Sequence, residues 1–178
     1  MTEERIALMK EIIESDEPSF IRWDGFLIAE VDGVPAAGLS GYETKLKSGE
    51  VYSQLLLEGM KRRGWTETAI DEYHKRSYGV LAVWPDLHDV ENHWVVEWVA
   101  TRPEYRRRGL VNQLLLRVLD IGREKGYKKA QVSLMIENAP ARRAYEKLGF
   151  SEYNTITSPL LSKLHLKTTG ILNLRMSL

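Results

Sequence analysis

Two apolar runs near the N-terminus flank a two-residue turn. Residues 26–31 and 34–39 are predominantly apolar, and only Asp32–Gly33 separates them. An Asp-Gly step between two apolar runs is a strong signal for a β-hairpin, because the turns that join antiparallel strands need residues that tolerate positive φ. The pattern therefore predicts two antiparallel strands joined at this turn.

Apolar residues elsewhere recur at the spacing of an α-helix. Upstream of the hairpin, a helix is expected over residues 2–15, with a buried stripe of Ile6, Met9, Ile12 and Ile13. Residues 48–78 form a second helical stretch, broken at Gly64, with stripes of Val51, Leu55, Leu56 and Met60 and of Ala69, Ile70 and Tyr73. A third helix begins at Gly109 or Leu110 and ends before Gly126, burying Leu114, Leu115, Val118, Leu119 and Ile121.

The remaining apolar runs are short and predict strands. We expect them over residues 78–84, 93–100, 130–136, 150–157 and 171–178, with a loop over 85–89. A short helix over 140–148 carries Pro140 in its first turn, where proline is well tolerated. Helices and strands in this order predict a mixed α/β fold, and 178 residues fit a single domain over residues 1–178.

Composition narrows the class of protein. Basic and acidic residues balance at 25 each, so no bulk field attracts nucleic acid or an anionic membrane. Cysteine is absent, which excludes disulfides, thiolate metal sites and a cysteine nucleophile. The N-terminus lacks a signal-peptide pattern, and no apolar run reaches membrane-spanning length. We expect a cytoplasmic protein with neither a metal nor a membrane partner.

An arginine-rich turn stands directly before the third helix. Arg106, Arg107 and Arg108 precede Gly109, and the helix follows at once. The first N–H groups of a helix have no intrahelical partner, and the helix dipole also favours an anion there. The turn therefore predicts a phosphate-bearing ligand. A solvated run of charges or a nucleic-acid patch is the alternative, and neutral net charge without interleaved aromatic residues argues against the patch.

Two segments in the second half of the chain resemble one known family. The turn Arg106–Val111 resembles the acyl-CoA-binding loop of the GCN5-related N-acetyltransferase (GNAT) superfamily, whose pattern is Gln/Arg-x-x-Gly-x-Gly/Ala. The family's second cofactor segment is similar to Asn138-x-x-Ala141-x-x-x-Tyr145-x-x-x-Gly149-Phe150. The resemblance covers residues 94–150 closely. It implies a mixed, largely antiparallel central sheet flanked by helices, with residues 48–89 as a helical insert before the cofactor-binding strand.

The resemblance implies acetyl-CoA as the co-substrate and direct transfer of its acetyl group to an amine, without an acyl-enzyme. The pantetheine arm would lie along Val96–Val99, where this strand splays from its neighbour, and a backbone N–H near Val99 would polarise the thioester. Residues 107–112 would hold the pyrophosphate. The implied cofactor-binding residues are Trp98, Val99, Ala100, Arg106, Arg107, Arg108, Gly109, Leu110, Val111, Asn138, Ala141 and Tyr145.

The roles of two of these residues stay open. Asn138 is equally well explained as the N-cap of a helix. Val111 departs from the family pattern, because a small residue there lets the pyrophosphate approach the backbone. The N–H of Val111 stays available if its side chain points inward.

Tyr145 matches the tyrosine that commonly protonates the leaving thiolate in this family, and core packing of its ring is the alternative. Glu97 is the candidate general base, because a charge in so apolar a strand is unusual; a buried ion pair is the alternative. Strand alternation puts Glu97 on the face of Val95 and Val99, opposite Val96 and Trp98. Other candidates for this role are His93, expected at the surface, and Ser133 or Gln131 orienting a water.

The acceptor is a primary amine of a small molecule or peptide whose identity stays open. The insert carries Trp65, Tyr73, Tyr78 and Trp84 with Glu67, Asp71 and Glu72, which suit either an acceptor wall or a satellite core with solvated acids. The family normally begins with a strand and two helices, whereas one helix is predicted here. An exposed sheet edge would favour a homodimer. A CoA-binding sensor without turnover and a nucleic-acid-binding protein are the alternative functions.

Overall fold

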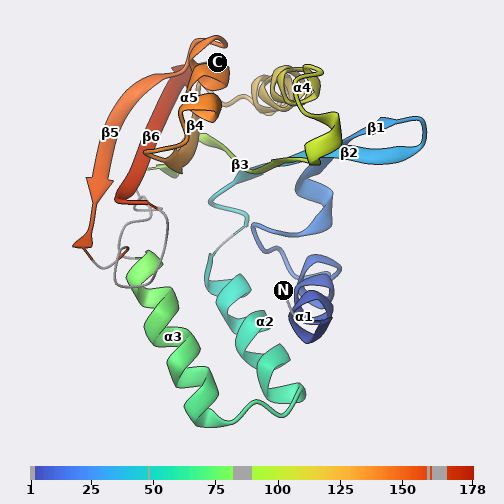
Figure 1. The fold of residues 1–178 in the computed structure, drawn as a ribbon, viewed down its shortest axis with the longest axis vertical. Helices are drawn as coiled ribbons and strands as arrows, with labels where there is room; N and C mark the ends of the chain where they lie inside the picture. Colours follow the sequence, from blue (N-terminus) through green and yellow to red (C-terminus); the bar gives the residue numbers. More distant parts are fainter. Residues whose placement is uncertain (1–2, 48, 82–89, 160, 162–167) are drawn as a thin grey trace.

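A single six-stranded sheet organises the fold, with its strands in the order β1-β2-β3-β4-β6-β5 (Figure 1). The computed structural model describes residues 3–47, 49–81, 90–159, 161 and 168–178. The strands are β1 Phe26–Val31, β2 Val34–Glu43, β3 Trp94–Thr101, β4 Lys129–Met135, β5 Ser151–Thr157 and β6 Gly170–Ser177. All neighbouring strands are antiparallel except β3 and β4. The prediction of a mixed, largely antiparallel sheet is confirmed.

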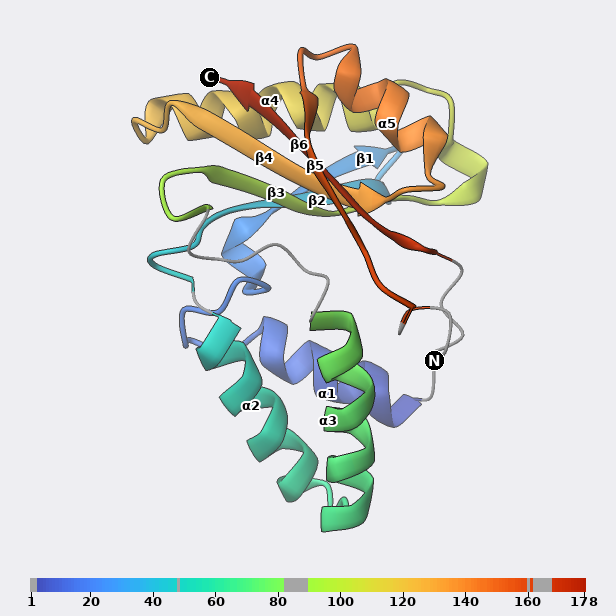
Figure 2. The ribbon, with the colours of Figure 1, turned by 90° about the vertical axis from the view of Figure 1, so that its left-hand side faces the viewer.

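Helices lie on both sides of this sheet (Figure 2). They are α1 Glu3–Ile13, α2 Gly49–Arg62, α3 Glu67–Leu81, α4 Leu110–Glu124 and α5 Ala139–Glu146, with short 3-10 turns at Trp23–Gly25 and Pro103–Tyr105. Helices α4 and α5 cover one face, which we call the α4 face. Helices α1, α2 and α3 form an arm below the other face, which we call the arm face. None of the helices within the described ranges combines the length and apolarity that crossing a bilayer requires.

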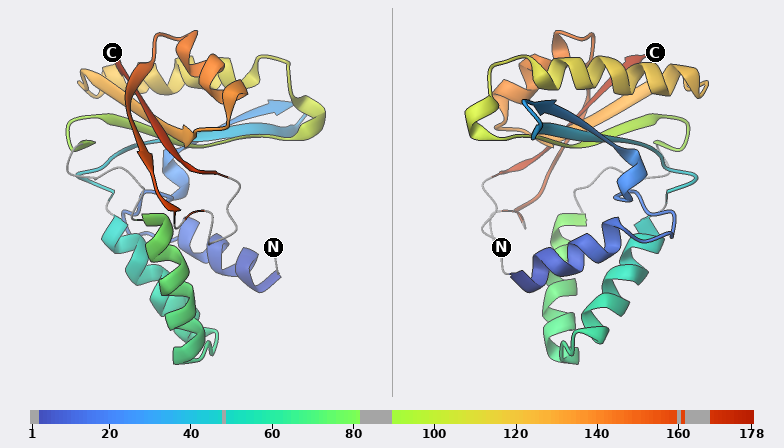
Figure 3. Two further views of the ribbon diagram at one scale, coloured as in Figure 1. Left: turned by 60° about the vertical axis from the view of Figure 1, so that its left-hand side comes forward. Right: turned by 90° about the vertical axis from the view of Figure 1, so that its right-hand side faces the viewer.

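The predicted hairpin forms at the predicted residues. Its turn places Asp32 at φ 54° and Gly33 at φ 76°, as a two-residue turn with two positive φ angles requires. Strand β2 runs on to Glu43, further than its apolar run indicated, because it also pairs with β3 along its length. Figure 3 shows the hairpin projecting at one side of the sheet beside the N-terminal end of α4.

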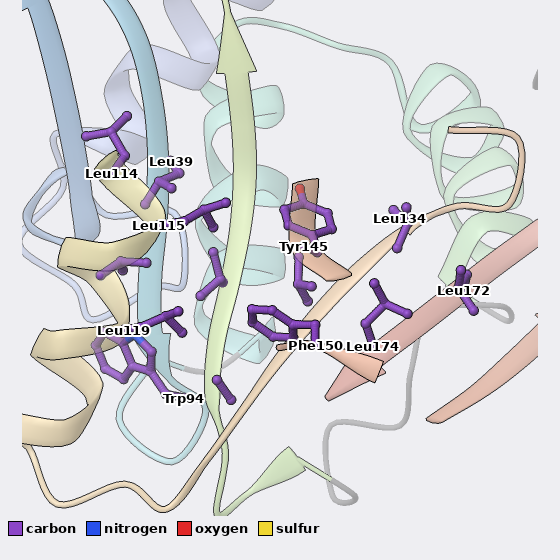
Figure 4. Packing of buried hydrophobic residues seen from close by; sticks show 14 of the residues in the cluster. Leu39, Trp94, Leu114, Leu115, Leu119, Leu134, Tyr145, Phe150, Leu172 and Leu174 are labelled. Atoms are coloured by element: carbon purple, nitrogen blue, oxygen red, sulfur yellow. The ribbon is translucent and has the colours of Figure 1, made fainter. Parts of the chain in front are cut away.

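The main core lies between the sheet and α4 (Figure 4). Leu115, Val118 and Leu119 of α4 are almost fully buried against Leu39 of β2 and Val96 of β3, as the helical spacing predicted. The indole of Trp94 fits between Gly41 of β2 and Gly122 of α4. A Cβ on either glycine would come within 2.7–2.8 Å of that ring. The two glycines therefore let helix and sheet close around a tryptophan.

Gly41→Ala should destabilise the protein by about 1–3 kcal/mol, because the added Cβ would come within 2.3 Å of Val118 and 2.7 Å of the Trp94 ring, and such overpacking forces the surrounding side chains to move. Gly25→Ala is the matched control, since a Cβ there would meet nothing closer than 3.3 Å, at the flexible end of Lys47. Urea denaturation of both variants measures the difference in free energy of unfolding. Equal stability of the two variants would contradict this account of the packing around Gly41.

The helical arm has its own core, in which Leu8, Ile12, Ile21, Leu56, Met60 and Ile70 are buried. The predicted stripe of α1 is wrong at Ile6, which is 52% exposed, while Leu8 is 4% exposed. The reason is that α1 packs on α2 at Gly59, whose missing side chain leaves room for Leu8.

The helical insert is confirmed as α2 and α3, which meet near Gly64. Trp65 and Tyr73 pack against the arm core, whereas the acids Glu67, Asp71 and Glu72 are exposed, so the described part of the insert fits the satellite-core alternative. The strand predicted over residues 78–84 is wrong for residues 78–81, which continue α3. Residues 82–89, with the predicted loop, lie outside the described residues.

Candidate active site

Strands β3 and β4 separate near the middle of the sheet. Their parallel pairing runs from Trp94 opposite Ala130 to Val96 opposite Val132 and does not continue beyond. Past this point each strand keeps pairing with its other neighbour, so a gap opens between the C-terminal halves of β3 and β4. The expectation that the strand splays over Val96–Val99 is confirmed beyond Val96, which itself still pairs with Val132.

A β-bulge in β3 lies at the mouth of this gap. Gly38 pairs with Ala100 and Ser40 with Glu97, so the single residue Leu39 faces two residues of β3. Trp98 takes up the extra length at φ 56°, in the left-handed region. Bulges are common beside active sites, where they redirect side chains.

The bulge overturns part of the predicted alternation along β3. Val99 packs into the core on the α4 face, together with Val96. Trp98 instead stacks on Phe20 beside the arm, with ring centroids 6.3 Å apart. Glu97 shares the arm face with Val95, as predicted, but its neighbour there is Trp98 and not Val99, because the inserted residue reverses the facing of those that follow it.

The arginine turn presents an open, positively charged helix N-terminus. Arg107 at φ 62° and Gly109 at φ 75° shape the turn, and Gly109 is the N-cap of α4. Arg106, Arg107 and Arg108 are all exposed, and a Cβ on Gly109 would meet nothing within 4 Å. Successive backbone N–H groups in such a turn form a concave anion site, which the dipole of the 15-residue helix strengthens. The residues present therefore fit a pyrophosphate.

Val111 does not obstruct this site. Its side chain is partly buried and packs against the main core, so it points inward from the first turn of α4. The backbone N–H at this position remains part of the helix N-terminus. The larger side chain at Val111 therefore leaves the approach to this backbone open.

Asn138 caps α5 through its side chain. Its Oδ1 accepts a hydrogen bond from the backbone N–H of Ala141 at 3.2 Å, and Pro140 follows in the first turn. The N-cap interpretation thus has a direct contact in the structure, and Ala141 packs partly against the main core. Capping fixes the start of the short helix that carries Tyr145.

Tyr145 projects from α5 toward the gap between β3 and β4. The side chain is buried, its ring packs edge-on against Phe150 at 6.1 Å, and burial raises the pKa of the phenol to about 12. In Figure 4 the ring lies between the diverging strands, with its hydroxyl oxygen toward their open end. Tyr145 therefore both packs in the core and presents a protonated hydroxyl at neutral pH.

Residues of the neighbouring strand β2 contact Glu97. The residue is 9% exposed, and the buried hydroxyl of Tyr42 hydrogen-bonds to its side chain. Burial and the adjacent carboxylate raise the pKa of Tyr42 well above its ordinary value. The hydroxyl of Ser40 donates to the backbone carbonyl of Glu97 at 3.4 Å. His93, expected at the surface, is buried at 6% exposure.

A row of polar side chains also lies on the arm face, along β4, β6 and β5. Ser133 of β4 donates to Asn173 of β6 at 2.7 Å, and Asn173 donates to Asn154 of β5 at 2.7 Å. Arg175 of β6 donates from Nε to Gln131 of β4, also at 2.7 Å. The sequence analysis included Gln131 and Ser133 but missed Tyr42, Asn173 and Arg175. Polar residues at alternate positions of an apolar run over 170–177 were the signal for the last two.

Comparisons with known proteins agree with this geometry. The model of the acetyltransferase (GNAT) family matches residues 3–150. No curated protein matches the chain in sequence. Among solved structures, one described as an acetyltransferase is 19% identical with a TM-score of 0.68, covering 99% of this chain and 81% of that one.

Two further solved structures are similar in fold. An N-acetyltransferase from Staphylococcus aureus Mu50 is 17% identical with a TM-score of 0.66, covering 99% of this chain and 82% of that one. A GNAT family acetyltransferase from Elizabethkingia anophelis, with acetyl-CoA bound, is 13% identical with a TM-score of 0.53, covering 86% and 75%. The chain thus shares its fold with these acetyltransferases.

Proposed function

Because the chain belongs to the GNAT family of acetyltransferases, we propose that it transfers the acetyl group of acetyl-CoA to a primary amine by direct attack. The proposal rests on three features of the structure taken together. The arginine turn offers a pyrophosphate site, the gap between β3 and β4 offers a slot for the pantetheine arm, and Tyr145 and Glu97 flank that gap. The acetyl-CoA bound to the Elizabethkingia protein supports the choice of co-substrate.

In the proposed complex, the turn and the splayed strand share the binding of the co-substrate. The N–H groups of Gly109, Leu110 and Val111 would bind the pyrophosphate, with charge from the three preceding arginines. The backbone of Val99, which has left the β3–β4 ladder, would hydrogen-bond to the pantetheine arm and to the thioester carbonyl oxygen. When bound, acetyl-CoA supplies an acetyl group already activated as a thioester.

Two side chains, on opposite faces of the sheet, would carry out the proton transfers of this reaction. As the amine nitrogen bonds to the carbonyl carbon and the C–S bond breaks, the nitrogen must lose a proton and the sulfur must gain one. Glu97, on the arm face, would accept the proton from the amine. Tyr145, on the α4 face, would donate its hydroxyl proton to the departing sulfur. The gap between β3 and β4 is what lets both groups reach one reaction centre.

Gly109→Asp should weaken acetyl-CoA binding at least about tenfold, because a carboxylate at the turn repels the pyrophosphate and a side chain fills the open approach. Gly64→Asp is the matched control. It has φ +74° against +75° at Gly109, and a Cβ at either position meets nothing within 4 Å. Calorimetric titration with acetyl-CoA measures the Kd of both variants.

The two variants share their backbone strain, so a difference in binding reports the turn itself. Equal loss of affinity in Gly64→Asp would mean that instability, and not the turn, causes the effect. Absence of binding to the unmodified protein at millimolar acetyl-CoA would overturn the proposed function.

A further inference from the structure

A cavity opens on the α4 face at one edge of the sheet, away from the candidate active site. Its volume is about 260 Å³, and it lies beneath the C-terminal half of α4. Space is left there because β2 runs on to Glu43, whereas β1 begins only at Phe26, opposite Ser40. The arginine turn is at the other end of α4 and Glu97 is on the arm face, and neither lines this cavity.

The interior of the cavity is apolar. Its apolar lining comes from Leu27 of β1, Trp94 of β3, Val118 and Ile121 of α4, and Leu46 of the loop after β2. The first four belong to the main core or pack against it, so these walls are fixed, and Figure 4 shows the Trp94 ring beside α4. Leu46 is 63% exposed. An apolar group that enters the cavity would be removed from water and would cover this leucine.

Four charged side chains surround the mouth of the cavity as two ion pairs. Lys47 donates to Asp24, and Lys125 donates to Glu43. The ammonium of Lys125 lies 5.8 Å from the centre of the Trp94 ring, which places this charge next to the apolar interior. Because the four charges cancel, a simple anion or cation gains little net attraction. A zwitterion finds an opposite charge for each of its two charged groups.

Each ion pair also has hydrogen-bonding capacity for a further group. An ammonium has three N–H donors, and the side chain of Lys125 is 47% exposed. At Asp24, Lys47 and Arg22 both approach Oδ1, at 2.5 and 3.5 Å. Oδ2 of Asp24, on a side chain that is 36% exposed, can accept another hydrogen bond. A ligand carboxylate can therefore accept from Lys125 while a ligand ammonium donates to Asp24 and to water at the mouth.

We propose that this cavity is a binding site for a free α-amino acid with an aliphatic side chain. The side chain would lie between Trp94 and Ile121, and the two charged groups would stay at the mouth. A cavity of about 260 Å³ holds roughly nine water molecules at about 30 Å³ each, which is close to the number of non-hydrogen atoms in leucine. The inference goes beyond the proposed function and does not depend on it.

The test compares L-leucine with three analogues, by calorimetry on the full chain without acetyl-CoA. Removal of the ammonium gives 4-methylpentanoate, and removal of the carboxylate gives 3-methylbutylamine. L-asparagine keeps both charges and nearly the shape of leucine but carries an amide in place of the two methyl groups. Leucine should bind with a Kd of about 1 mM or below, as a small ligand in a small site does. Each analogue should bind at least about tenfold more weakly, because it lacks one of the three contacts.

The indole N–H of Trp94 shows whether leucine enters this cavity. Its Nε1 is buried and has no hydrogen-bond partner within the described part of the chain, so its NMR resonance depends on what fills the space beside the ring. The resonance is identified by its loss in Trp94→Phe. Leucine should shift it, and L-asparagine at the same concentration should not.

Two surface variants separate the charged contact from the apolar one. Lys125→Met should lower the affinity for leucine to about that of 3-methylbutylamine, and Leu46→Ser should lower it without changing the order of the probes. Arg117→Met is the matched control, because Arg117 also projects from α4, is paired with Glu124 and does not line the cavity. It should bind leucine like the unmodified protein.

Three results would each overturn the inference. The first is no heat and no shift of the Trp94 resonance at a leucine concentration well above the expected Kd. The second is equal binding of leucine and of either analogue that lacks one charge. The third is an unchanged affinity in Lys125→Met, which would place bound leucine elsewhere on the protein.

Discussion

Tyr145→Phe should lower kcat for acetyl transfer about 100-fold or more and leave the Kd for acetyl-CoA unchanged. A positioned general acid contributes on the order of 10²–10⁴ to a rate, and the substitution removes only the hydroxyl. The ring keeps its contact with Phe150, so the core on the α4 face is preserved. Steady-state kinetics with acetyl-CoA and any accepted amine, beside calorimetry, separates the two parameters.

The pH dependence gives this prediction a second readout. Burial raises the pKa of Tyr145 to about 12, so its hydroxyl keeps the proton below that pH and loses it only as the pH rises through 12. The raised pKa also adds stability that is present below pH 10 and is lost between pH 10 and about 12. We therefore expect any fall of kcat between pH 7 and 10 to come from another group.

Tyr127→Phe is the control for losing a phenol from this core. Tyr127 packs against Trp94 at the far end of α4, and burial also raises its pKa. It should keep the kcat of the unmodified protein. If Tyr145→Phe also keeps kcat within about threefold, Tyr145 is a packing residue and the proton reaches the sulfur by another route.

Elements set by local chemistry were predictable from the sequence. The hairpin turn at Asp32–Gly33, the helix N-terminus at Gly109 and the cap at Asn138 each depend on residues within a few positions of one another. Their φ angles and hydrogen bonds follow from those residues alone. The turn proposed to bind the pyrophosphate is of this kind.

Features set by pairing between distant segments were not predictable in the same way. The bulge at Trp98 exists because Leu39, some sixty residues earlier, faces two residues of β3. No local pattern marks such a shift in register, yet it reverses the facing of Val99 and turns Trp98 onto the arm. The burial of Leu8 in place of Ile6 likewise depends on Gly59 of α2.

The row of polar side chains on the arm face was likewise not predictable from local sequence. Asn173 and Arg175 interrupt an apolar strand, and single polar residues in a strand have many structural explanations. Only the order of strands brings them beside Gln131 and Ser133 of β4, next to the gap. The proposed acceptor side of the site is therefore assembled by topology, whereas the proposed cofactor side is assembled by local sequence.

Glu97→Gln should lower kcat about 100-fold or more, with little change in the Kd for acetyl-CoA. Glutamine has the shape of glutamate and still offers an oxygen to the hydroxyl of Tyr42, so the packing of the arm face is retained. It cannot accept the proton of the amine, and loss of a general base costs on the order of 10²–10⁴ in rate. Added formate should restore part of the activity of Glu97→Ala, because a small carboxylate can occupy the space that the truncation leaves.

Two further variants decide whether the charge or its surroundings matter. Tyr42→Phe removes the hydrogen bond to Glu97 but keeps the carboxylate and the ring contact with Phe20, so kcat should fall less than about tenfold. Ser133→Ala tests the alternative in which β4 orients a water, and it should also cost less than tenfold. If Ser133→Ala loses as much activity as Glu97→Gln, or if formate restores nothing, the base lies elsewhere on the arm face. The remaining outcome is that only the two Glu97 variants lose activity and that formate restores Glu97→Ala. In that case the carboxylate of Glu97 accepts the proton directly, on the face of the gap opposite Tyr145.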